Sequence, residues 1–174
     1  DMLLAPVRSS LIRWLVGYGR VADAARCLGG AFTLAADVVE GDRRGRTIGF
    51  PTANLDMASL ADAALPARGV YAALATTPDG SVHPAAVNVG VKPTFNPPRP
   101  SIEAHLLDYD GDLYGRTLDL AFYHWVRDEQ KFPDLDALTR QIGRDVSCVR
   151  EHFARHDARR AGLAASNGES SSHE

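Results

Sequence analysis

The spacing of hydrophobic and polar residues changes along the chain from a helical period to an alternating one. Residues 8–28 carry apolar side chains at three- and four-residue intervals, and Gly17 and Gly19 divide this stretch into two expected helices. From Phe32 to Val38 every second residue is apolar, which predicts a half-buried strand. Further strand-like runs, separated by turn residues, cover 69–77, 82–89, 101–107 and 117–125. The pattern predicts short N-terminal helices followed by a mainly β domain.

A helical period returns near the C-terminus. Apolar residues from Leu135 to Phe153 recur at helical spacing, and Asp134 is a suitable N-cap. Ser9 or Ser10 is expected to cap the first helix, and Gly29-Gly30 to end the second. Several strands joined by tight turns favour a small antiparallel barrel, because closure removes exposed sheet edges. Periodicity alone leaves a sandwich as the alternative.

Composition limits the classes of function. The net charge of −3 argues against a dedicated nucleic-acid surface, which is usually basic. No apolar run is long enough to span a bilayer, and no signal peptide is visible. The two cysteines, Cys27 and Cys148, are far apart and match no zinc-site spacing. We therefore expect a cytoplasmic protein that acts on small molecules, without nucleic-acid or membrane partners.

The segment 41–54 joins a turn rich in Gly and Arg to the run Phe-Pro-Thr-Ala-Asn. Glycines let backbone N–H groups approach an anion, and arginine adds positive charge. If the second half is extended, Thr52 and Asn54 project to the same side, since strand side chains alternate. Such neutral oxygens suit Mg²⁺ when nucleotide phosphates supply the negative charge. The alternative is a solvated turn in which both side chains bond to nearby backbone. The candidate phosphate-binding residues are Gly41, Gly45, Arg46 and Gly49.

Glu103 is a carboxylate between apolar neighbours on an expected strand. Ile102 and Ala104 would point to one side of the sheet, and Glu103 and His105 to the other. On residue type alone, Glu103 and His105 would be ordinary polar residues of a solvent-facing strand. A carboxylate there would also be able to accept a proton from a substrate hydroxyl. Of the two residues, His105 is expected to be structural.

Four strings of the chain together resemble the bacterial riboflavin kinase module, the C-terminal half of bifunctional FAD synthetases. They are the Gly/Arg-to-Asn segment at 41–54, Asn-Val-Gly-Val-Lys-Pro-Thr-Phe at 88–95, Ser-Ile-Glu-Ala-His-Leu-Leu-Asp at 101–108 and Trp-Val-Arg-Asp-Glu-Gln-Lys-Phe at 125–132. They occur in the family's order, and the resemblance as a whole spans residues 32 to about 153, most of the chain. Trp125-Val126 departs from the Arg-Leu that is usual in the last string.

The resemblance implies a six-stranded antiparallel Greek-key barrel with a C-terminal helix, and an enzyme that phosphorylates the riboflavin 5′-hydroxyl with ATP, giving FMN and ADP. It implies that Thr52 and Asn54 hold Mg²⁺ and ATP, with Glu103 as the base. Riboflavin would lie beside Thr94, Phe95, Arg127 and Phe132. The alternative for the last two is an ordinary strand-to-helix linker with a buried phenylalanine.

The start of the chain resembles a different module. Val7–Arg13 is similar to the string that ends the adenylyltransferase half of FAD synthetases, whose His-x-Gly-His motif does not occur here. We expect residues 1–30 to be a helical remnant of that module, 31–161 the kinase barrel and helix, and 162–174 a disordered tail. The upstream module is the expected partner in the full-length protein, and this chain alone is not expected to make FAD. The alternatives are a non-catalytic flavin-binding or regulatory module and, with less support, a nucleic-acid-binding barrel.

Overall fold

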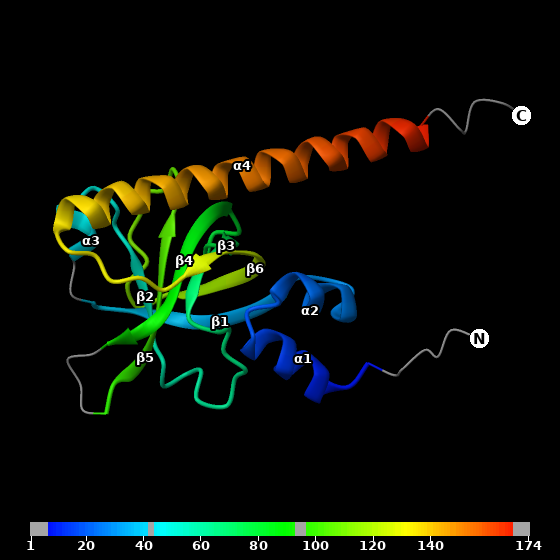
Figure 1. Ribbon diagram of the computed structural model, residues 1–174. Coiled ribbons are helices and arrows are strands. Elements are labelled where there is room, and N and C mark those ends of the chain that lie inside the picture. The colour runs from blue at the N-terminus through cyan, green and yellow to red at the C-terminus, as the bar shows by residue number, and fades with distance from the viewer. Residues whose placement is uncertain (1–6, 42–43, 93–96, 169–174) are drawn as a thin grey trace, which may run out of the picture.

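A closed barrel of six antiparallel strands forms the centre of the protein. The computed structural model describes residues 7–41, 44–92 and 97–168 (Figure 1). The strands follow the order β1-β2-β5-β4-β3-β6 around the barrel, which confirms the predicted six-stranded architecture. Their bounds are β1 Phe32–Val39, β2 Ala53–Leu55, β3 Gly69–Thr76, β4 Val82–Lys92, β5 Arg99–Leu106 and β6 Thr117–Asp128. The helices are α1 Ser9–Gly17, α2 Val21–Leu28, α3 Arg44–Thr47 and α4 Leu135–Gly168.

The alternation of apolar residues determines which side of each strand faces the barrel interior. On β5, Ile102, Ala104 and Leu106 are buried in the central core, as their spacing predicts. Aromatic side chains also fill the barrel interior. Tyr71 and Phe122 are fully buried, and their rings meet edge to face with their centres 5.5 Å apart. The residues between these positions, Glu103 among them, therefore lie on the outer face of the barrel.

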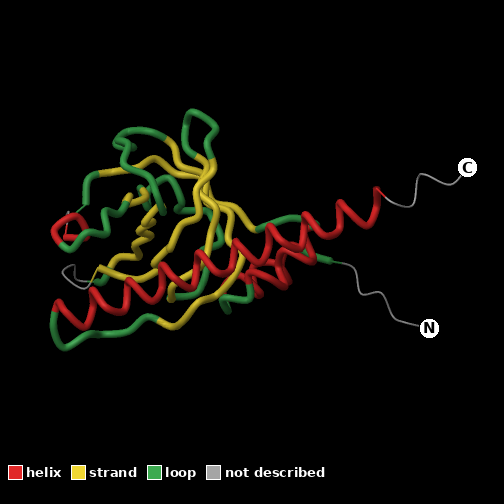
Figure 2. The backbone as a smooth tube through the Cα atoms, turned by 90° about the horizontal axis from the view of Figure 1, so that it is seen from above, coloured by secondary structure: helices red, strands yellow, loops and turns green. Residues whose placement is uncertain are grey.

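The long helix α4 covers part of that outer face and projects beyond it at its C-terminal end (Figures 1 and 2). Ala72 of β3 and Ala86 of β4 present small side chains, against which Val149 and Phe153 of α4 pack. Asp134 caps α4 as predicted, accepting a 2.7 Å hydrogen bond from the N–H of Ala137. None of the helices in the described part of the chain combines the length and apolarity needed to cross a membrane.

α4 also extends further than the sequence predicts. It continues through Gly168, so residues 162–168 are helical rather than part of the disordered tail expected from residue 162. Leu163, Ala164 and Ala165 are good helix formers, and extending an existing helix costs less than starting one. Residues 169–174 lie outside the described chain.

The helices α1 and α2 pack under one end of the barrel. Leu15, Val16 and Ala24 form a small core against Phe32 at the start of β1. Gly29 ends α2 in the left-handed conformation, with φ of 73°, as predicted. The predicted caps Ser9 and Ser10 are wrong, because both lie inside α1, whose N-cap is Arg8 and makes no side-chain cap.

The turn between α1 and α2 also touches the barrel wall. Gly19 lies directly against the indole ring of Trp125 on β6, and a Cβ at residue 19 would overlap that ring. Gly19 also has a positive φ of 73°, which an L side chain rarely adopts. The helical end and the barrel therefore form one packed body.

A pair of stacked histidines at the edge of the α4 contact makes stability depend on pH. The rings of His124 on β6 and His152 on α4 lie 5.1 Å apart and 11° from parallel. Burial lowers the pKa of His152 below 6.5, and the charges of His124, His156 and Arg155 lower it further. The unfolded chain therefore takes up this proton at a higher pH than the folded one, so stability falls as the pH drops below about 6.5.

We expect the melting temperature to fall between pH 8 and pH 5.5, and the fall to be smaller in His152→Asn. Thermal melting of both proteins over this range measures the difference. An identical pH slope in the two proteins would contradict the assignment to His152.

Candidate nucleotide and catalytic site

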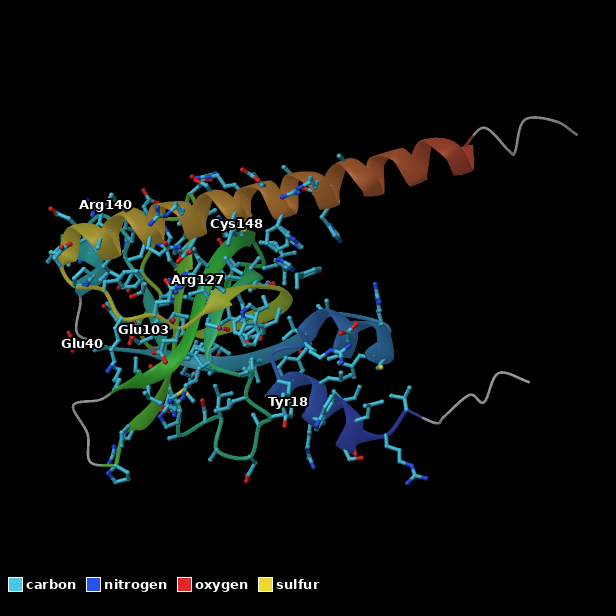
Figure 3. All side chains as sticks on the ribbon, viewed as in Figure 1. Tyr18, Glu40, Glu103, Arg127, Arg140 and Cys148 are labelled. Carbon is cyan, nitrogen blue, oxygen red and sulfur yellow. The ribbon has the colours of Figure 1, made fainter. Side chains whose placement is uncertain are left out.

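The predicted amide ligand and the predicted base lie on neighbouring strands. In the antiparallel register, Asn54 of β2 is paired with Glu103 of β5, and Glu103 is paired with Asn88 of β4. Paired residues project to the same face, so the three polar side chains form a row on the outer face of the barrel. Glu103 is labelled in Figure 3. Two residues predicted from separate strings are thus brought side by side.

Asn54 is held against the start of the Gly/Arg segment. Asn54 is only 8% exposed, and a Cβ at residue 41 would overlap its amide group. The absence of a side chain at Gly41 therefore leaves space for the Asn54 amide. The sequence had suggested a different role for this glycine, in phosphate binding. The remaining part of the segment forms α3 and a turn, in which Gly45 accepts a 2.8 Å hydrogen bond from the N–H of Phe50. Gly49 follows α3 with φ of 83°.

Replacing Gly41 by alanine is expected to weaken binding of Mg²⁺–ADP at least tenfold, because the added methyl group would displace the Asn54 amide. Titration calorimetry measures this affinity. Gly17→Ala is the matched control, since a Cβ at residue 17 meets nothing within 4 Å. Equal affinities of the two variants would show that the Asn54 amide has no part in nucleotide binding.

His105 ties this segment to β5. Its Nδ1 lies 2.8 Å from the carbonyl oxygen of Pro51, which can only accept, so Nδ1 carries the proton. The imidazole also meets the Phe50 ring edge to face at 5.4 Å. These contacts agree with the structural role expected for His105, and they fix the backbone directly before Thr52.

A cavity of about 390 Å³ opens beside Thr52. Such a volume is typical of small-molecule sites. Arg46 and Thr52 offer a guanidinium group and a hydroxyl to the cavity, and the loop after β5 also lines it. The lining residues are Val38, Arg46, Pro51, Thr52, Ala53, Ala104, Leu106, Tyr109, Asp110, Gly111, Asp112, Leu113 and Tyr114. Asn54 and Glu103 do not line this cavity; they belong to the adjacent outer face.

The donor set suits a cation that arrives with its own anionic ligands. Thr52 and Asn54 offer neutral oxygens, and the described residues contain no cluster of three or more His, Cys, Asp or Glu that would hold a metal. The Oδ1 atom of Asn54 already faces a cation, because Nζ of Lys92 lies 3.4 Å away. The residues present therefore fit Mg²⁺ that is bound together with nucleotide phosphates.

The predicted flavin-binding residues are placed only in part. Thr94 and Phe95 lie outside the described residues. Arg127 of β6 forms a bidentate ion pair with Asp145 of α4, with N···O distances of 2.7 to 3.1 Å. Its guanidinium carbon lies 5.7 Å from the centre of the Phe132 ring. The structure thus gives Arg127 a buried partner on α4, and its contact with flavin stays a prediction.

Sequence reasoning missed two parts of this site. Lys92 lies within the string 88–95 but was not singled out, although a lysine in a motif that precedes the catalytic strand is a signal of charge near the site. The loop from Tyr109 to Tyr114 lies between the expected strands 101–107 and 117–125, and nothing in its sequence indicates that it lines a cavity together with Arg46 and Thr52.

The riboflavin kinase family model matches residues 28–153. The bifunctional riboflavin kinase/FMN adenylyltransferase of Bacillus subtilis is 39% identical over 151 residues, covering 85% of this chain and 47% of the relative. The protein of the same name from Escherichia coli K12 is 38% identical over 147 residues, covering 84% and 46%.

Among solved structures, the crystal structure of a macrolide-efflux protein from Streptococcus pneumoniae is similar, with a TM-score of 0.73 and 32% identity. The match covers 83% of this chain and 46% of that one. Judged from the Bacillus subtilis and Escherichia coli relatives, the chain spans about half the length of the curated relatives it matches.

Proposed function

Because the chain belongs to the riboflavin kinase family, we propose that it transfers the terminal phosphoryl group of ATP to the 5′-hydroxyl of riboflavin, giving FMN and ADP. The observation that carries the proposal is the pairing of Asn54 with Glu103, next to a cavity lined by Arg46 and Thr52. Phosphoryl transfer needs mainly positioning and charge neutralisation, and this arrangement offers both.

The nucleotide occupies the cavity. Its phosphates lie at the side where Arg46 supplies positive charge, and its base and ribose lie toward the loop of Tyr109 to Tyr114, where Asp110 and Asp112 would repel phosphate but accept hydrogen bonds. Thr52 and Asn54 would hold the Mg²⁺ that accompanies ATP, and the bound ion would supply charge neutralisation at the phosphates. The tie between His105 and Pro51 keeps the Thr52 backbone in place for this role.

Glu103 acts on the acceptor. It lies on the strand next to Asn54, so a hydroxyl that reaches it from the outer face is close to the Asn54 amide. Its carboxylate takes the proton of the 5′-hydroxyl while the oxygen forms a bond to phosphorus and the bond to the ADP oxygen breaks. The flavin ring is placed near Thr94, Phe95, Arg127 and Phe132, as the family resemblance implies. The bifunctional relatives carry further sequence beyond this match, and in a longer protein an adenylyltransferase module would be the partner.

The direct test is to incubate the chain with riboflavin, ATP and Mg²⁺ and to separate the flavins by chromatography. FMN is the expected product, and ADP should appear in equal amount; samples without ATP are the control. Flavin binding without FMN formation or ATP consumption would overturn the proposal in favour of a non-catalytic flavin-binding module.

A further inference from the structure

Lys92 places a cation on the amide oxygen of Asn54. It is the last residue of β4 and is half-buried, and its Nζ reaches Asn54 on β2 across the intervening strand β5. Asn54 is 8% exposed, so the oxygen that Lys92 contacts is largely protected from water. A charged side chain in this position affects the affinity of this oxygen for any other cation.

The contact between Lys92 and Asn54 is easily exchanged. Its length of 3.4 Å exceeds the ~2.7–3.2 Å of an ordinary N–H···O hydrogen bond. The ammonium group stands on a flexible four-carbon stem and can turn its three donors toward a stronger acceptor. Phosphate oxygens are such acceptors, since a bond between two charged groups is stronger than one to a neutral amide.

Lys92 and a metal ion would compete for the same oxygen. Two cations that share one amide oxygen lie only a few ångströms apart, and in a partly buried site their repulsion is weakly screened. A metal ion alone would therefore have to displace the lysine. A nucleotide brings phosphates that draw the lysine away and supply ligands for the metal at the same time.

We propose that Lys92 is the resident counter-cation of the nucleotide site. Without nucleotide, its ammonium keeps Oδ1 of Asn54 turned toward the site; when nucleotide binds, the ammonium moves to the phosphates and leaves Oδ1 available to Mg²⁺. Lys92 is thus a positioning residue that makes metal binding depend on nucleotide binding. This inference rests on the function proposed above.

The proposal predicts two opposite effects of Lys92→Met. Metal-free ADP should bind about tenfold more weakly, the loss expected for one charge-assisted hydrogen bond. Mn²⁺ without nucleotide should bind severalfold more tightly, because the competing ammonium is gone. A residue with a merely structural role would not move the two affinities in opposite directions.

The experiment compares wild type with Lys92→Met, Lys92→Gln and Lys92→Arg. Calorimetry measures ADP binding in the presence of a chelator, and electron paramagnetic resonance measures binding of Mn²⁺ alone. Lys92→Arg keeps the charge and should retain most of the ADP affinity. Arg26→Met is the control for charge, because Arg26 lies on α2 with its side chain 85% exposed. Thermal melting verifies that each variant is folded.

The outcomes separate this inference from the proposed function. If wild type makes FMN but the neutral Lys92 variants bind ADP and Mn²⁺ as wild type does, the counter-cation role is wrong and the kinase function stands. Weaker binding of both ligands would also overturn it, because it would indicate general damage to the site. If wild type binds no nucleotide and makes no FMN, the proposed function fails, and this inference fails with it.

Discussion

Glu103→Gln is expected to lower kcat for FMN formation by about a hundredfold or more, the usual contribution of a positioned general base. Glutamine has the size and shape of glutamate but cannot take a proton from the 5′-hydroxyl. Glu103 is paired with Asn54 and Asn88 on the neighbouring strands, so the substitution leaves the backbone of the site in place. Substrate binding should therefore change little, and the loss should appear in kcat rather than in KM.

Steady-state rates from chromatography, with riboflavin binding followed by fluorescence quenching, measure the two quantities separately. Glu151→Gln is the matched control, because it removes the same charge from an exposed position on α4, where the side chain is 70% exposed. A Glu103→Gln protein with an unchanged kcat would remove Glu103 from the mechanism.

Arg127→Met is expected to destabilise the fold by about 3–5 kcal/mol, the usual cost of leaving one member of a buried ion pair alone. The side chain of Arg127 is 16% exposed and that of Asp145 is 5% exposed. Gln141 donates a further hydrogen bond of 2.8 Å to Asp145, but a neutral amide does not replace the lost charge. The ion pair joins the end of β6 to α4, so its loss should also loosen the helix.

Urea unfolding of the single variant and of the double variant Arg127→Met/Asp145→Leu measures this cost. The double variant should regain most of the stability, because no charge is left buried. Arg155→Met, at an exposed pair with Glu151, should change stability by less than about 1 kcal/mol. An Arg127→Met protein as stable as wild type would show that the ion pair with Asp145 does not stabilise the fold.

The same double variant tests the flavin role that the sequence suggests for Arg127. If Arg127 only fixes α4, restoring stability should restore flavin binding, measured by fluorescence quenching. If Arg127 also contacts flavin, the double variant should be stable and still bind flavin weakly. Stability and binding thus report on two different roles of one residue.

The alternating pattern predicted the barrel well because strand side chains on a closed sheet have only two environments. Leu34, Ala36 and Val38 are buried at every second position of β1, as expected. The ends of the elements were less predictable: β4 continues to Lys92, beyond the expected end at residue 89, and β5 begins at Arg99 instead of residue 101. Strand pairing extends these ends, and pairing partners are not visible in local sequence.

In the candidate site, too, contacts between distant parts of the chain could not be predicted from local sequence. Resemblance to a family selected Asn54 and Glu103, and the register brings them together. The partnership of Arg127 with Asp145 was not predictable, because it joins a strand end to a helix face through tertiary packing. The contact of Lys92 with Asn54 likewise spans β5, and no spacing in the sequence encodes it.

The indole of Trp125 against Gly19 bears on where a longer protein of this family can be divided. The two glycines at residues 29 and 30 resemble a domain boundary in the sequence. The helices before them, however, cover an aromatic surface of the barrel. A gene fragment meant to yield a well-behaved catalytic half therefore has to begin upstream of Ser9, so that those helices are kept.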